Sequence, residues 1–72
     1  MTTENKYKNI KQVERELRKK FKKHEYVHIF FNGGAIDITD FSISDNRVFL
    51  FYLGSQIAYI EYTKITGIFP LD

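Results

Sequence analysis

The first third of the chain carries a dense series of basic side chains. Residues 1–23 contain nine Lys and Arg against three Glu, a formal net charge of +6, whereas residues 24–72 carry −4. A row of positive side chains on one surface binds phosphates, and each contact with a nucleic-acid backbone makes binding more sensitive to salt. The alternative is an ordinary solvated face, because lysine is common at protein surfaces. The residues predicted to contact nucleic acid are Lys11, Arg15, Arg18, Lys19, Lys22 and Lys23.

The other chemically active residue types form no catalytic or metal-binding pattern. His24 and His28 are four residues apart, a spacing that brings two ligands together only on a continuous helix, and His28 falls within a strand pattern. No nucleophile, base or phosphate-binding loop accompanies Asp37 and Asp40 in the sequence. The absence of cysteine excludes a disulfide scaffold and a thiolate site. We therefore expect a non-enzymatic protein with no catalytic residues, no metal and no cofactor.

A helix is predicted to carry the basic residues. Asn9 followed by Gln12 fits an N-cap with its capping-box partner, so the helix begins at about Ile10. An apolar stripe about 80° wide then follows at helical spacing, and the basic residues, together with Lys8, lie opposite it. The stripe consists of Ile10, Val13, Leu17 and Phe21.

Some charge pairs along this helix stabilise it and others destabilise it. The spacings Glu14–Arg18 and Glu16–Lys20 favour it, whereas like charges four residues apart oppose it by about 0.2–0.5 kcal/mol per pair. The helix therefore needs its packed stripe to persist, and an anionic partner would relieve the repulsion. The like-charge series is Lys11, Arg15, Lys19 and Lys23.

The remainder of the chain has the pattern of a β-meander. Asn32-Gly33 and Gly54-Ser55 fit tight turns, and Thr63-Lys64 fits a short corner before the last strand. Inside the second strand the apolar parity changes near Thr39-Asp40, which predicts a sharp bend. The predicted strands are Val27–Phe31, Ala35–Ser44, Val48–Leu53, Gln56–Tyr62 and Ile65–Phe69.

These elements predict one domain over residues 1–72, with a basic amphipathic helix in 1–24 and the β-meander in 25–72. The expected class is mainly β with an N-terminal α-helix, built as a small, strongly bent, antiparallel five-stranded barrel. The chain has 12 Phe and Tyr residues, which we expect mostly in the core or at a subunit interface. A chain of this size buries little surface alone, and open strand edges invite pairing, so a homo-oligomer is expected.

No segment predicts a membrane span, and binding of the amphipathic helix to an anionic membrane ranks last, because its apolar stripe is narrow and lacks tryptophan. The longest apolar run, Val48–Leu53, is far shorter than the ~18 residues that span a bilayer. The first residues, Met1–Asn5, lack the apolar centre of a signal peptide. The expected location is the cytoplasm.

The order of elements resembles a known family. The predicted order is a basic helix, a strand with an Asn-Gly turn, a bent strand, an Asp/Asn turn, two further strands and a corner into a short last strand. This order resembles the Sm-like fold, particularly bacterial Hfq. SH3-like barrels end in a similar strand. The Lys-His pair of the Hfq corner is replaced by Tyr62-Thr63, and Ser42 stands where the family has aspartate. The segments that carry the resemblance are Val27–Gly33, Asp45–Leu50 and Ile60–Thr66.

Two functions of different classes follow. The resemblance and the basic helix imply an oligomeric Sm-like protein that contacts single-stranded RNA through the helix face and the barrel rim. The alternative is a small protein-interaction module, an adaptor or inhibitor, that uses a strand edge and the basic helix to bind an acidic protein.

Overall fold

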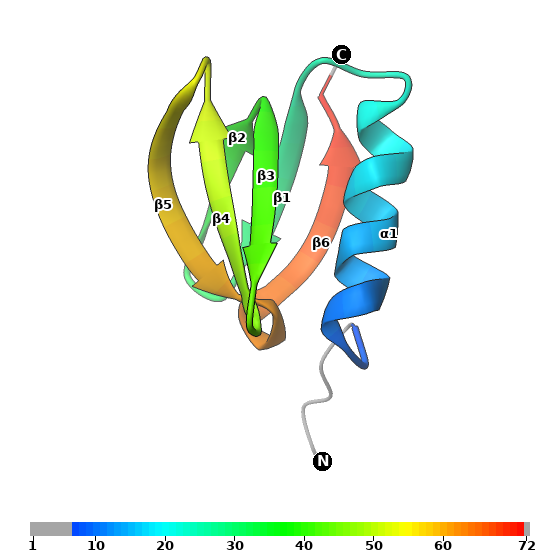
Figure 1. The fold of residues 1–72 in the computed structure, drawn as a ribbon, viewed down its shortest axis with the longest axis vertical. Coiled ribbons are helices and arrows are strands. Elements are labelled where there is room, and N and C mark those ends of the chain that lie inside the picture. Colours follow the sequence, from blue (N-terminus) through cyan, green and yellow to red (C-terminus); the bar gives the residue numbers. More distant parts are fainter. Residues whose placement is uncertain (1–6, 72) are drawn as a thin grey trace.

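The structure is a computed structural model that describes residues 7–71; the first six residues of the predicted basic segment, and Asp72, lie outside them. A helix precedes six strands, which form two three-stranded antiparallel sheets in the orders β2-β1-β6 and β3-β4-β5 (Figure 1). The predicted class, mainly β with an N-terminal helix, is confirmed. The elements are α1 (Ile10–Phe21), β1 (Val27–Phe31), β2 (Gly34–Ile38), β3 (Asp40–Ser44), β4 (Arg47–Tyr52), β5 (Ser55–Glu61), the 3-10 turn η1 (Tyr62–Lys64) and β6 (Ile65–Pro70).

The N-terminus of α1 is capped by the predicted side chains. The Asn9 Oδ1 atom accepts a hydrogen bond of 3.0 Å from the Gln12 backbone N–H. The Gln12 Oε1 atom in turn accepts one of 2.6 Å from the Lys8 N–H, one residue before the expected donor. Two backbone N–H groups at this end of the helix, those of Lys8 and Gln12, are thereby bonded to side-chain oxygens. The helix ends at Phe21, the last residue of its apolar stripe, and Lys22 is its C-cap.

The predicted bend lies at Thr39 and divides the expected second strand into β2 and β3, so there are six strands rather than five. The Thr39 N–H donates to the Phe51 carbonyl oxygen over 2.8 Å, and the Thr39 Oγ1 atom accepts from the Leu53 N–H over 2.8 Å. Both bonds tie the bend to the end of β4. Within residues 7–71 no strand pairing joins the two sheets elsewhere, so a closed barrel is not observed.

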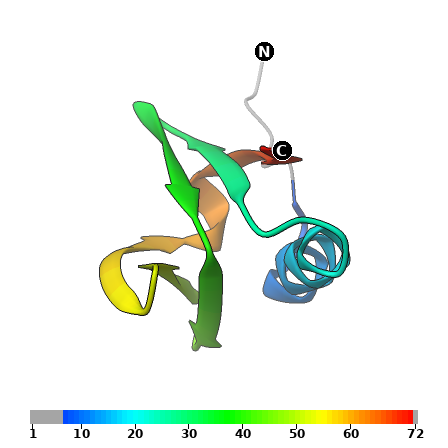
Figure 2. The same cartoon turned by 90° about the horizontal axis from the view of Figure 1, so that it is seen from above.

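The helix lies against one side of the β-structure. It runs beside β6, while β5 lies at the opposite side of the molecule (Figure 1, Figure 2). Its stripe packs against β6, β1 and β3. The residues that are less than 2 % exposed come from the helix and from both sheets, so one core joins all three layers: Val13, Leu17, Val27, Ile29, Ile38, Val48, Leu50 and Ile65.

Two of the predicted turns are displaced by one residue. The β4–β5 turn is Leu53-Gly54 rather than Gly54-Ser55, because both central positions take positive φ, +50° at Leu53 and +90° at Gly54. Such a pair of left-handed residues matches the twist of a two-residue hairpin. The corner before the last strand begins at Tyr62, whose N–H donates to the Asn46 carbonyl oxygen over 3.0 Å. This bond holds the corner against the β3–β4 turn.

Replacing the helix cap should destabilise the fold. We expect Asn9→Ala to lower the free energy of unfolding by about 1 kcal/mol, because the Gln12 N–H loses its acceptor. Urea denaturation followed by circular dichroism measures the change. Lys19→Ala, at an exposed position in the last turn of the helix, is the control and should change the value by less than about 0.5 kcal/mol. Equal values for the two variants would show that the cap is not formed in solution.

Candidate nucleic-acid interface

The basic residues predicted to bind nucleic acid are all exposed on or just after α1, on the face that points away from the core. Five of them have no side-chain hydrogen bond or ion pair to any residue within 7–71. Their charges are therefore available to a partner. We call these five residues the basic face: Lys11, Arg15, Lys19, Lys22 and Lys23.

Arg18, the sixth predicted residue, is engaged within the fold. Its guanidinium donates to the Glu14 carboxylate, with distances of 2.8 Å from Nη2 and 3.1 Å from Nε. Its Cζ atom also lies 5.7 Å from the centre of the Phe41 ring, on which Phe21 stacks with a centroid distance of 6.0 Å. At the junction of α1 and β3, the Phe41 ring therefore contacts both the Arg18 guanidinium and the Phe21 ring. The pairing of Arg18 with Glu14 was expected from their spacing, whereas its contact with Phe41 comes only from the packing of α1 against β3.

The helix acids lie at the borders of the basic face. Glu14 binds Arg18, and Glu16 binds Lys20, whose Nζ atom is 2.9 Å from the Glu16 Oε1 atom. Both pairs have the i, i+4 spacing expected from the sequence, and both leave the basic face itself free of carboxylates. A polyanion would meet only positive charge there.

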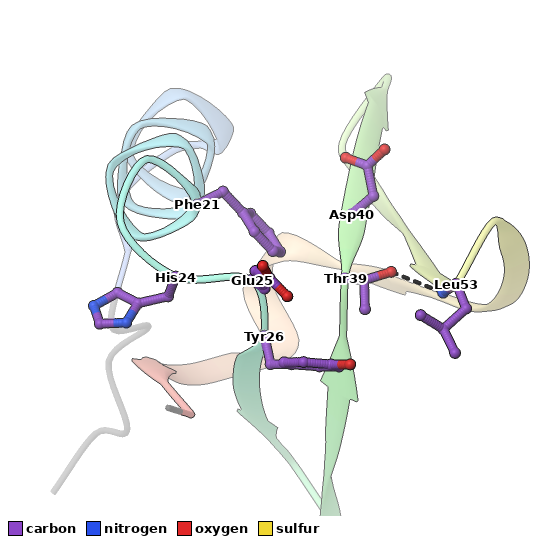
Figure 3. A pocket seen from close by; sticks show the side chains of 7 residues that line it. All are labelled: Phe21, His24, Glu25, Tyr26, Thr39, Asp40 and Leu53. Atoms are coloured by element: carbon purple, nitrogen blue, oxygen red, sulfur yellow. Dashed lines mark hydrogen bonds between the residues drawn. The ribbon is translucent and has the colours of Figure 1, made fainter.

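A pocket of about 400 Å³ lies beyond the C-terminal end of the helix, between it, the β2–β3 bend and the β4–β5 turn (Figure 3). Glu25 and Asp40 both line it, and the His24 ring points away from the other side chains (Figure 3). Two carboxylates repel phosphate, so this pocket marks where an anionic ligand would stop. Its other lining residues are Phe21, Tyr26, Thr39 and Leu53.

His28 and Asp37 form a pair that the sequence analysis missed. The two residues are register partners across the β1–β2 hairpin, and the His28 Nδ1 atom contacts the Asp37 carboxylate. The signal was present in the sequence, since a two-residue turn at Asn32-Gly33 places residue 28 opposite residue 37. Asp40 lies apart from this pair, and its Oδ1 atom accepts from the Phe41 N–H over 2.8 Å. Within residues 7–71 no group of three His, Asp or Glu residues is arranged to hold a metal ion.

None of the aromatic residues of the strands is fully buried in the core, although Phe41 packs against it, so the expectation of aromatic residues at a subunit interface stays a prediction. The core is aliphatic; Tyr7, which precedes the helix, is the one buried aromatic residue among those described. Burial raises the pKa of its phenol above the usual value, and the Glu16 carboxylate adds to this rise. The most exposed rings are those of Phe30, Tyr52, Tyr59 and Phe69.

Comparison with known proteins finds no family model, no curated protein and no solved structure that matches this chain. No helix within residues 7–71 is long and apolar enough to cross a membrane.

The structural role of Arg18 can be separated from the free charge of Arg15. We expect Arg18→Ala to lower the free energy of unfolding by about 1 kcal/mol, because it removes an i, i+4 ion pair and a cation–π contact. Arg15→Ala should change it by less than about 0.5 kcal/mol. Urea denaturation of both variants measures the difference, and a larger loss in Arg15→Ala would contradict the assignment.

Proposed function

We propose that this chain is a non-enzymatic, cytoplasmic, oligomeric RNA-binding protein of the Sm-like type. The basic face holds the phosphates of single-stranded RNA, and the barrel rim beside the helix adds contacts. One observation carries the proposal: five exposed cations lie together on the outer side of a helix, with no carboxylate paired to them within residues 7–71. Arg18, at the margin of this face, contributes its positive field while keeping its contact with Glu14.

The composition of the basic face favours contact with a backbone rather than with base edges. It consists of Lys and Arg alone, and contacts to phosphates position a protein without reading a sequence. The helix also buries its apolar stripe against both sheets, so it does not project as a recognition helix. These features favour single-stranded RNA with little sequence preference over duplex DNA.

The strand arrangement supports the Sm-like part of the proposal. If β2 and β3 are counted as one strand bent at Thr39, the chain has a helix and five strands in the order β6-β1-β2/β3-β4-β5. The 3-10 turn Tyr62–Lys64 then corresponds to the corner before the last strand. We propose that this is a strongly bent five-stranded barrel, open between β5 and β6.

The outer edge of β5 supports assembly. This seven-residue strand is paired on one side only within the described chain, and Ile57 and Tyr59 are 46 % and 59 % exposed. Beside it lies a cavity of about 400 Å³ lined by partly buried apolar side chains that pack against the core, among them Ile36, Ala58 and Ile60. Long apolar edge strands pair with other chains unless they are covered or charged. We propose that β5 pairs with a strand of another copy.

Removing charges from the basic face should weaken RNA binding and its salt dependence together. Filter binding with single-stranded RNA at several salt concentrations gives the slope of the logarithm of the binding constant against the logarithm of the salt concentration. The double variant Arg15→Ala/Lys19→Ala should reduce the magnitude of this slope by about 1.4, since each phosphate contact contributes about 0.7. The matched control is Arg47→Ala/Lys64→Ala, which removes the same charge from the only Lys and Arg after residue 24. The control should leave the slope unchanged. Equal effects of the two double variants, or binding that does not respond to salt, would remove the proposal.

The solution mass should exceed that of a dimer. We expect light scattering to give a multiple of the 8.6 kDa chain in the range of a closed ring, a hexamer or heptamer being the outcome that the Sm-like resemblance implies. Ile57→Lys, which places a charge on the edge strand, should lower that mass. A monomeric or dimeric wild-type protein would contradict the assembly.

A protein-interaction module is the second candidate, and the exposed edge of β5 favours it. An extended segment of an acidic protein would add a strand there while the basic face meets its charge. Under this reading the protein shows no salt-dependent binding to RNA in the assay above.

A further inference from the structure

Three aromatic side chains form a cluster on the outer surface of the sheet β2-β1-β6. The Phe30 and Phe69 ring centroids are 5.5 Å apart with an interplanar angle of 68°, and the His28 ring meets Phe30 edge-on at 4.6 Å. Phe30 is 41 % and Phe69 is 50 % exposed, so both rings present area to solvent. We call His28, Phe30 and Phe69 the aromatic platform.

A glycine beneath the platform gives its Phe rings room to approach the strand backbone. Gly67 is the register partner of Phe30, and a Cβ atom built on it would lie 2.6 Å from the Phe69 Cε2 atom and 3.5 Å from the Phe30 Cδ2 atom. Gly67 itself is buried although it belongs to the outer surface, because the rings cover it. A glycine inside a strand weakens the strand unless something approaches its backbone closely. Here the close approach places atoms of the Phe69 and Phe30 rings near the Gly67 backbone, while much of each ring remains exposed.

A groove connects the platform with the helix. It has a volume of about 620 Å³ and is lined from the helix side by Tyr7, Glu16 and Lys20 and from β6 by residues 67–70. Lys20 lies one position after Lys19 and one turn before Lys23, so the groove begins beside the basic face. A single strand held on the helix therefore has a route to the rings.

The charges around the platform select which part of a nucleotide is bound there. The Asp37 carboxylate contacts His28 at one border, and the Glu16 carboxylate contacts Lys20 at the other. Carboxylates repel phosphate, whereas the uncharged face of a base stacks on an aromatic ring with a gain of about 1–3 kcal/mol. Bases are free to stack in this way only where they are unpaired.

We propose that the aromatic platform stacks an unpaired base of the single-stranded RNA whose phosphates lie on the basic face. This inference rests on the proposed function and adds to it a second, base-binding site on β1 and β6. The platform supplies affinity for the base, while the basic face supplies affinity for the backbone and the dependence on salt.

The test compares an oligouridylate with an abasic oligoribonucleotide of the same length. Wild-type protein should bind the oligouridylate about tenfold more tightly, and Phe69→Ala should lose this preference while keeping its affinity for the abasic strand and its salt slope. Phe69→Leu keeps an apolar side chain without a ring face and should behave like Phe69→Ala. Tyr52→Ala is the matched control, because it removes an exposed ring from β4 of the other sheet, outside the β5 edge, and it should keep the preference.

Each contrary result points to a different failure. If the wild-type protein binds both strands equally, or if Phe69→Ala and Tyr52→Ala behave alike, the platform does not bind a base and the phosphate-binding function stands. If Phe69→Ala changes the solution mass, the platform is a contact between copies of the chain and the proposal is wrong. If the wild-type protein binds neither strand, the proposed function itself fails.

Discussion

Burial of one narrow apolar stripe of α1 is the constraint on which the rest of the structure depends. Val13 and Leu17 are fully buried, and the helix that carries them packs against strands of both sheets. A 12-residue helix with like charges one turn apart is marginal alone, so this packing is what maintains it. Because the buried stripe covers one side only, the same packing turns the basic face outward. The stability of the helix and the availability of its charge have a single cause.

The division between an aliphatic core and aromatic surfaces is the second organising feature. Strand β4 shows it directly: Val48 and Leu50 point into the core, while Phe49 and Phe51 point outward and are half-buried. Alternation along a strand sends successive side chains to opposite faces, so a strand that is apolar throughout must expose half of its residues unless something covers them. In this chain the outward half is aromatic. The outer surfaces of both sheets therefore offer rings to a base or to another copy of the chain.

Local signals predicted much of the architecture. The Asn9 cap, the bounds of the first strand and the bend at Thr39 follow from residue type and periodicity over a few positions, and the structure has all three. The register partners His28 and Asp37 follow as well once the hairpin turn is placed, although the sequence analysis did not take that step. The β4–β5 turn was misplaced because Leu53 adopts a left-handed conformation that its residue type disfavours.

The amino-acid sequence by itself determined where the positive charge lies, because the 3.6-residue period separates the basic residues from the apolar stripe whatever the helix packs against. Only the tertiary structure decided which charges are free and which rings are exposed. Arg18 meets the Phe41 ring because β3 packs against the helix, and Phe30 lies beside Gly67 and Phe69 because β1 and β6 pair in one register. Such contacts join residues far apart in the chain, and their geometry exists only after the two sheets and the helix have packed together.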